Sequence, residues 1–142
     1  MGTRAASDEH YVIDLCDEVL GSPAIRQATF DWLLGDPGKT GARRKLAVDA
    51  YWPSLDVAVE YNEKQHTEAV PFFDKPDVKT VSGVSRGEQR ALYFQRRVEL
   101  LPQHGIRLVV IDVTELAHRR GKLLRDRDHD LGVLRRRLLG PS

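Results

Sequence analysis

Apolar residues in the first part of the chain recur at helical spacing. Residues 7–20 carry such a stripe, made of Val12, Ile13, Leu15, Cys16, Val19 and Leu20. Ser7 or Asp8 can cap the start of this helix, and Gly21 can end it. Ser22-Pro23 has the form of another helix start, and it precedes a second stripe at Ile25, Ala28, Thr29, Trp32 and Leu33. We therefore expect a second helix that ends at Gly35.

The period changes from helical to two after a turn-rich loop at residues 36–41. Alternation over residues 46–51 and 55–60 predicts two strands, and Trp52-Pro53-Ser54 between them predicts a hairpin. Residues 62–80 form a long irregular connection, which we interpret as a substrate-facing flap. Ser85 to Glu88 has capping-box spacing and predicts a helix to about residue 103, closed by Gly105.

Residues 106–112 are apolar enough for a strand that is buried on both faces. A helix between the hairpin and this strand makes a crossover unit. Thr114 starts another helical stretch, and residues 126–139 predict a final amphipathic helix. We expect an α/β fold in which a mixed β-sheet is flanked by helices. Residues 1–142 are interpreted as a single domain, with residues 1–7 flexible and residues 115–142 forming a C-terminal helical extension.

The composition fits a soluble globular protein, since 41% of the 142 residues are hydrophobic and 30% are charged. The single cysteine, Cys16, cannot form an intramolecular disulfide and lies where a core residue belongs. The longest apolar run, residues 108–111, is far too short to cross a membrane, and no basic segment followed by an apolar stretch opens the chain. We expect a cytoplasmic protein without a membrane partner.

The formal net charge is only +1, yet basic residues cluster. They precede the central segment, follow it, and crowd the tail at Arg119, Arg120, Lys122, Arg125, Arg127 and Arg135 to Arg137. The tail is explained equally well by a solvated helix surface. Five arginines nearer the centre are candidates for nucleic-acid binding: Arg44, Arg86, Arg90, Arg96 and Arg97.

Two carboxylates fall on one face of the predicted hairpin. If Pro53-Ser54 forms a two-residue turn, Asp49 lies opposite Ala58, and Glu60 is its diagonal neighbour with Cα atoms roughly 7 to 8 Å apart. Two such groups repel each other and lose hydration. Magnesium would remove that penalty and supply a bound water to attack a phosphodiester. A hairpin with one solvent-exposed face explains the same spacing equally well.

Two residues beyond the second strand could join this chemistry. His66 follows Glu60 by six positions, where a short loop could return its imidazole to the carboxylates. Histidine transfers protons near neutral pH, and Lys64 could stabilise a phosphorane-like transition state. Either residue could equally be an ordinary member of a polar loop.

The chain carries Asp49, then Glu60-Tyr61-Asn62-Glu63-Lys64-Gln65-His66, then Tyr93-Phe94-Gln95-Arg96-Arg97, Gly105 and an apolar strand at residues 106–110. This multi-part spacing resembles the PD-(D/E)XK restriction-endonuclease-like superfamily, in particular the branch typified by very-short-patch-repair endonucleases. The resemblance covers roughly the central half of the chain.

The resemblance implies a metal-dependent DNA endonuclease that uses Mg²⁺ or Mn²⁺ and leaves 5′-phosphate and 3′-hydroxyl ends. It implies that Asp49 and Glu60 are metal ligands, that His66 is the catalytic histidine, and that Arg97 lies near the site. Asn62 stands where the branch has Asp and the wider superfamily has Lys, and its amide oxygen can ligate a cation without adding charge. Glu63 replaces the usual Gly, and Phe94 replaces the helix Asp.

An acidic residue of the first helix often completes such sites, and Glu18 or Asp14 could serve here. Glu88, at the start of the predicted crossover helix, is a further candidate acid. The resemblance also allows a homodimer that cuts both strands. Two other functions stay open: a nuclease-fold DNA-binding module without turnover, and a structural or partner-binding protein that uses its leucine-rich last helix.

Overall fold

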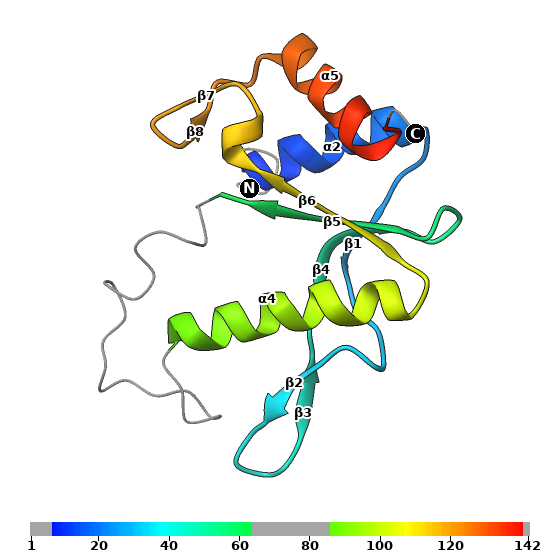
Figure 1. The fold of residues 1–142 in the computed structure, drawn as a ribbon, viewed down its shortest axis with the longest axis vertical. Coiled ribbons are helices and arrows are strands. Elements are labelled where there is room, and N and C mark those ends of the chain that lie inside the picture. The colour runs from blue at the N-terminus through cyan, green and yellow to red at the C-terminus, as the bar shows by residue number, and fades with distance from the viewer. Residues whose placement is uncertain (1–6, 64–85, 141–142) are drawn as a thin grey trace.

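The computed structural model describes residues 7–63 and 86–140. Its largest sheet has the strand order β1 (Ile25–Ala28), β4 (Val48–Trp52), β5 (Val57–Asn62) and β6 (Arg107–Asp112) (Figure 1). β4 pairs antiparallel with both β1 and β5, whereas β5 and β6 are parallel. The predicted α/β class, with a mixed sheet flanked by helices, is therefore confirmed. The expected flap lies outside the described residues from residue 64 onward, as do Ser85 and residues 1–6.

Helices cover both faces of this sheet. α4 (Arg86–Gln103) connects β5 to β6 and lies on one face, as the crossover pattern predicts. α2 (Asp8–Leu20) and α5 (Arg127–Leu138) lie together on the other face (Figure 1). Ser7 caps α2 by accepting a hydrogen bond from the His10 backbone N–H at 3.0 Å, and Gly21 ends it in the left-handed conformation. All three helices occur close to where the sequence predicts them.

Two apolar clusters hold these layers together. Under α2 and α5, Trp52 and Ile13 are completely or almost completely buried, together with Leu134 and Leu138 of α5. Beneath α4, Leu101 is buried against Ala58 and Leu33. The leucine-rich last helix therefore contributes its apolar face to the core. In the described part of the chain, no helix is long and apolar enough to span a bilayer.

The hairpin is present, but its turn is longer than expected. Residues 53–56 form the turn, and Asp56 adopts a left-handed φ of 52°. Trp52 pairs with Val57, and Ala50 pairs with Val59. The four-residue turn thus shifts the pairing by two residues, so Asp49 faces Glu60 directly and the predicted partner Ala58 pairs with Tyr51. The diagonal arrangement predicted from a two-residue turn is wrong.

The second predicted helix is also wrong. β1 (Ile25–Ala28) occupies part of that segment, and β2 (Leu34–Pro37) then pairs with β3 (Arg43–Lys45). The apolar spacing at residues 25–33 suits a helix, but the segment hydrogen-bonds to the exposed edge of β4. Gln27 interrupts any helix there with a φ of 51°. Pairing with a distant strand outweighs the local periodicity.

The stretch after β6 differs from prediction in a similar way. Val113–Glu115 forms only a short 3-10 helix, η1, and a small hairpin of β7 (His118–Arg119) and β8 (Lys122–Leu123) follows it. Gly121 supplies a positive φ at the hairpin turn. Residues 115–140 therefore contain a strand pair as well as the predicted final helix.

Candidate acidic site on the central hairpin

Asp49 of β4 and Glu60 of β5 lie side by side at the end of the hairpin that is remote from its turn. The Tyr61 backbone N–H donates to Asp49 Oδ2 at 2.8 Å, and the Asp49 backbone N–H donates to Glu60 Oε2 at 2.8 Å. Each carboxylate is thereby bonded to the backbone of the neighbouring strand. The reciprocal bonds hold the two acidic groups in a fixed relation to each other.

The second oxygen of each carboxylate is held less firmly. Asp49 Oδ1 accepts a long hydrogen bond of 3.5 Å from Gln27 Nε2. Glu60 Oε1 lies 3.9 Å from Arg97 Nε, which itself donates to the Ala47 carbonyl oxygen at 3.0 Å. These two oxygens are therefore the ones that a ligand could engage without breaking the backbone bonds.

Burial makes ionisation of this pair costly. It raises the pKa of Glu60 to about 7, and the charges of Asp49 and Glu9 add to the effect, whereas Arg97 and the Asp49 N–H oppose it. Burial likewise raises the pKa of Asp49, against the hydrogen bonds from Tyr61 and Gln27 and the charge of Arg97. Near neutral pH the pair is thus not fully ionised, and a bound cation would favour its charged form.

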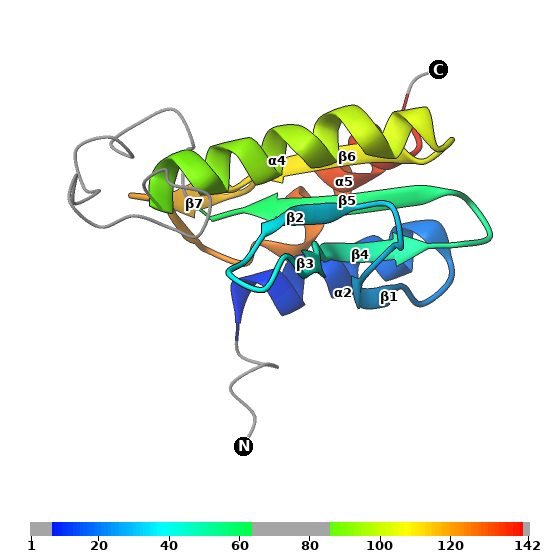
Figure 2. The same ribbon diagram turned by 90° about the horizontal axis from the view of Figure 1, so that it is seen from below.

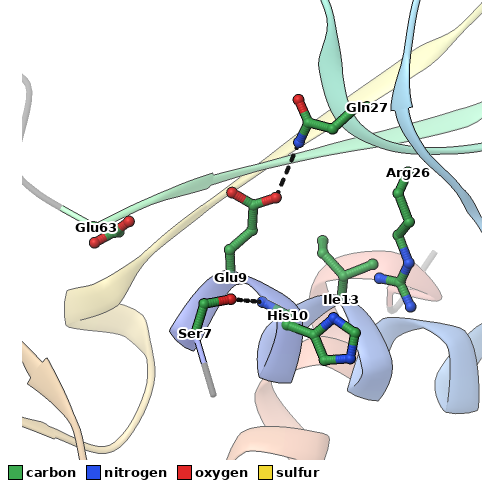
Figure 3. A pocket seen from close by; sticks show the side chains of 7 residues that line it. All are labelled: Ser7, Glu9, His10, Ile13, Arg26, Gln27 and Glu63. Carbon is green, nitrogen blue, oxygen red and sulfur yellow. Dashed lines mark hydrogen bonds between the residues drawn. The ribbon is translucent and has the colours of Figure 1, made fainter. Parts of the chain in front are cut away.

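Glu9 is the acid that the first helix brings toward this pair. Gln27 Nε2 donates to Glu9 Oε2 at 3.1 Å (Figure 3). The same amide nitrogen also donates to Asp49 Oδ1, so one amide bridges the two acids. Gln27 does so from a left-handed backbone conformation, which costs a non-glycine residue on the order of 1 kcal/mol. Strain of this kind is often found at functional sites.

The first-helix acids expected from the sequence point elsewhere. Glu18 forms an ion pair with Arg127. Asp14 accepts a hydrogen bond from Arg26 at 2.9 Å and lies 3.2 Å from His10. A signal for Glu9 was present in the sequence, because Glu9 precedes the buried residues Ile13 and Cys16 by one and two helical turns.

A pocket of 310 Å³ opens beside Glu9, between the start of α2 and the end of β5. Figure 3 shows the side chains around it, which are Ser7, Glu9, His10, Ile13, Arg26, Gln27 and Glu63. Gln27 belongs both to this wall and to the hydrogen bonds of Asp49. Gln27 therefore links the acid pair to this pocket, whereas Asp49 and Glu60 are not among the residues that line it.

Asn62 ends β5 two residues beyond Glu60 and meets Asp112 of β6. The two residues pair across the parallel strands, and Asn62 Nδ2 donates to Asp112 Oδ1 at 2.8 Å. Asp112 was not singled out from the sequence, although the ends of neighbouring parallel strands meet at one edge. Lys64 and His66 lie outside the described residues.

The predicted basic residues fall into two groups. Arg97 lies against the acid pair, and Arg96 is tied to β2 through the Leu34 carbonyl oxygen at 2.9 Å and Asp36 at 3.0 Å. The second group is exposed and consists of Arg44 on β3 and of Arg86 and Arg90 on α4. Glu88, the further candidate acid, is also exposed on the first turn of α4.

The donor set for a metal is correspondingly small. Among residues 7–63 and 86–140, no three His, Cys, Asp or Glu side chains come together as a metal-binding group. What the described chain offers is the Asp49–Glu60 pair with its two weakly held oxygens, and Glu9 linked to it through Gln27. Oxygen donors of this kind suit Mg²⁺ or Mn²⁺.

No protein-family model, curated protein or solved structure matches this chain. The resemblance drawn from the motif residues therefore stays an expectation about family. Independently of family, the chain has a mixed α/β fold in which two strands bring a pair of partly buried carboxylates together, and Gln27 links this pair to a neighbouring pocket.

Proposed function

We propose that this chain is a metal-dependent DNA endonuclease that hydrolyses phosphodiester bonds at the Asp49–Glu60 pair. The supporting observation is that two largely buried carboxylates face each other, each bonded to backbone through one oxygen only. A purely structural role explains this less well, because Arg97 only partly offsets two carboxylates whose raised pKa values show that their ionised forms are costly, and a bound divalent cation would favour those forms.

The weakly held oxygens, Asp49 Oδ1 and Glu60 Oε1, are the natural ligands for Mg²⁺ or Mn²⁺. Such a cation supplies Lewis-acid polarisation of the phosphate and lowers the pKa of a water molecule. Asn62 could add only its amide oxygen, since its nitrogen donates to Asp112. The fit rests on oxygen donors and on the raised pKa values of both acids.

The remaining residues of the site orient and balance these acids. Gln27 donates hydrogen bonds to both Asp49 and Glu9, so Glu9, in place of Glu18 or Asp14, is the first-helix acid linked to the proposed site, outside its metal-binding pair. Arg97 offsets the negative charge of Glu60 from 3.9 Å away. We retain His66 for proton transfer and Lys64 for charge stabilisation, as the family resemblance and their positions after β5 suggest.

DNA is the proposed substrate because of the family resemblance and the exposed arginines Arg44, Arg86 and Arg90. Arginine contacts to phosphate position a nucleic-acid backbone without reading its sequence. A DNA substrate is consistent with the cytoplasmic location expected from the sequence.

Nicking of supercoiled plasmid tests the proposal. We expect cleavage in Mg²⁺ or Mn²⁺ and none in EDTA, and a loss of roughly 100-fold or more for Asp49→Asn and Glu60→Gln, which keep side-chain size. Glu9→Gln should lose about 10-fold, because it acts at the edge of the site.

The matched control is Asp56→Asn, which removes an exposed carboxylate from the same hairpin and keeps a residue that tolerates left-handed φ. It should cut like the wild type. Equal metal-dependent cleavage by the wild type, Asp49→Asn and Glu60→Gln would rule out the site.

A second function is favoured by one observation. Asn62 is neutral and its amide nitrogen is engaged by Asp112, where the related motif has a charged residue. A chain that keeps the fold but not turnover would bind DNA in a salt-sensitive way without cutting it in either metal. Measuring binding beside nicking distinguishes the two functions.

A further inference from the structure

The β7–β8 hairpin carries three basic residues at its tip. Arg119 pairs directly with Lys122 across the two short strands. Arg120 and Gly121 form the loop, with φ values of 53° and 80°, as a tight two-residue hairpin turn requires. The turn therefore holds three cationic side chains within four consecutive residues.

These cations are concentrated, and no ion pair offsets them in the described part of the chain. Arg119, Arg120 and Lys122 are exposed and together line a pocket of 410 Å³. Within residues 7–63 and 86–140, none of the three forms an ion pair, and three acids of the adjoining helices, Asp8, Glu18 and Glu115, are paired with other arginines. Like charges directly opposite each other destabilise a strand pair. Binding of a polyanion would reduce this repulsion between Arg119 and Lys122.

The base of the hairpin is firmly attached. Ala117 precedes β7 and Leu124 follows β8, and the Leu124 N–H donates to the Ala117 carbonyl oxygen at 2.9 Å. The Ala117 N–H donates to the fully buried Asp130 at 2.9 Å, and Tyr11 of α2 donates to the same carboxylate at 2.6 Å. Leu123 packs on the core. A preorganised arm of this kind loses little entropy on binding.

The hairpin lies at the same end of the molecule as the acidic site. Figures 1 and 2 place β7 at the end where β5 finishes and α4 begins, and Figure 1 shows α2 starting there too. Glu60 belongs to that end of β5, and Glu9 belongs to the first turn of α2. The cationic tip and the acid pair therefore belong to the same end of the molecule.

We infer that the β7–β8 hairpin binds the sugar-phosphate backbone of DNA beside the proposed cleavage site. The inference rests on the proposed function for its ligand. Three exposed cations around a concavity fit phosphate groups and offer no pattern for reading bases, so the contact is independent of DNA sequence. It assigns to Arg119, Arg120 and Lys122 the positioning of the strand to be cut.

Fluorescence anisotropy with a labelled DNA duplex in EDTA, titrated with salt, tests the inference. The variant is Arg119→Gln/Lys122→Gln, and the control is Arg135→Gln/Arg136→Gln, which makes the same charge change on exposed residues in the last turn of α5. The hairpin variant should bind DNA roughly 10-fold more weakly than the wild type. The slope of the logarithm of its binding constant against the logarithm of the salt concentration should be smaller in magnitude by about 2. The control should keep the wild-type slope.

The outcomes separate this inference from the nuclease proposal. Equal binding and equal slopes for the two double variants overturn the hairpin role, even where the wild type cuts plasmid. Binding that depends on the hairpin in a protein that never cuts supports the hairpin role and overturns the nuclease. A wild type that neither binds nor cuts overturns both. Thermal melts should show both variants folded, since removing opposed like charges does not weaken the hairpin.

Discussion

At the scale of single residues, the burial and the charge partners of Glu60 are the most informative features of the proposed site. Its side chain is only 13% exposed, it sits opposite Asp49, and the nearest guanidinium nitrogen is 3.9 Å away. A structural glutamate would gain more from a direct ion pair with Arg97 or from an exposed position. The observed arrangement leaves the charge of Glu60 only partly offset by Arg97, and the proposed metal ion would complete the balance.

The pH dependence of stability tests this reading. The pKa of Glu60 is raised from 4.5 to about 7 on folding, so its stabilising contribution is fully present below about pH 4.5 and is lost as the pH rises through about 7. In EDTA, Glu60→Gln should remove that loss. Its free energy of unfolding at about pH 8 should exceed that of the wild type by on the order of 1–3 kcal/mol.

Urea unfolding of both proteins at about pH 5 and about pH 8 measures the difference. Asp56→Asn, which changes an exposed carboxylate of the same hairpin, should follow the wild type. If the free energy of unfolding fell equally for the wild type and Glu60→Gln between the two pH values, Glu60 would be ionised at no cost in the folded protein.

At the scale of elements, α4 serves as the support for the β2–β3 hairpin. The Asp36 backbone N–H donates to the Tyr93 hydroxyl at 2.8 Å, and Arg96 donates to Leu34 and Asp36. Gly35 permits this close approach, because a Cβ there would lie 3.0 Å from the Tyr93 hydroxyl oxygen. Arg96 is thus committed to joining two elements.

We expect Arg96→Ala to lower the free energy of unfolding by about 1–3 kcal/mol, because it removes a charge-assisted bond and leaves the Leu34 carbonyl oxygen without this donor. Gln95→Ala is the control, since Gln95 is exposed and, among the described residues, its side chain bonds to Glu99 on the same helix; it should cost less than about 0.5 kcal/mol. Equal effects in urea unfolding would contradict the supporting role of Arg96.

At the scale of the whole molecule, the buried carboxylate of Asp130 joins three elements. It accepts hydrogen bonds from Tyr11 of α2 and from Ala117 at the base of the β7–β8 hairpin, while it belongs to α5 itself. Burial, and then the bond to Asp130, raise the pKa of Tyr11, which therefore stays protonated and donating. The network connects the helix that carries Glu9 to the basic hairpin.

Tyr11→Phe should lower the free energy of unfolding by about 1–3 kcal/mol, because a buried carboxylate loses one of its donors. Tyr51→Phe removes a similar hydroxyl bond, to Asp56 at 3.0 Å, but in an exposed setting, and should cost at most about 0.5 kcal/mol. The comparison is made by urea unfolding at one pH. Indistinguishable losses would show that the Asp130 network adds nothing to stability.

Local patterns in the sequence were enough to predict much of this fold. The helices near residues 8–20, 86–103 and 127–138 follow from apolar spacing and from caps such as Ser7 and Gly21, which act within a few residues. The alternation around Trp52-Pro53 identified the β4–β5 hairpin. The meeting of Asp49 and Glu60 on neighbouring strands could therefore be predicted, because both strands belong to one short segment.

Only the tertiary structure decided how these parts fit. Residues 25–28 form β1 because the edge of β4 offers hydrogen bonds that no local pattern reveals. The turn at Asp56 shifted the register by two residues and set Asp49 squarely against Glu60. Glu9 reaches the site through Gln27, a strand residue in a segment predicted as helix. Each of these outcomes depends on contacts between segments far apart in the chain, whose free energy exceeds that of local preferences.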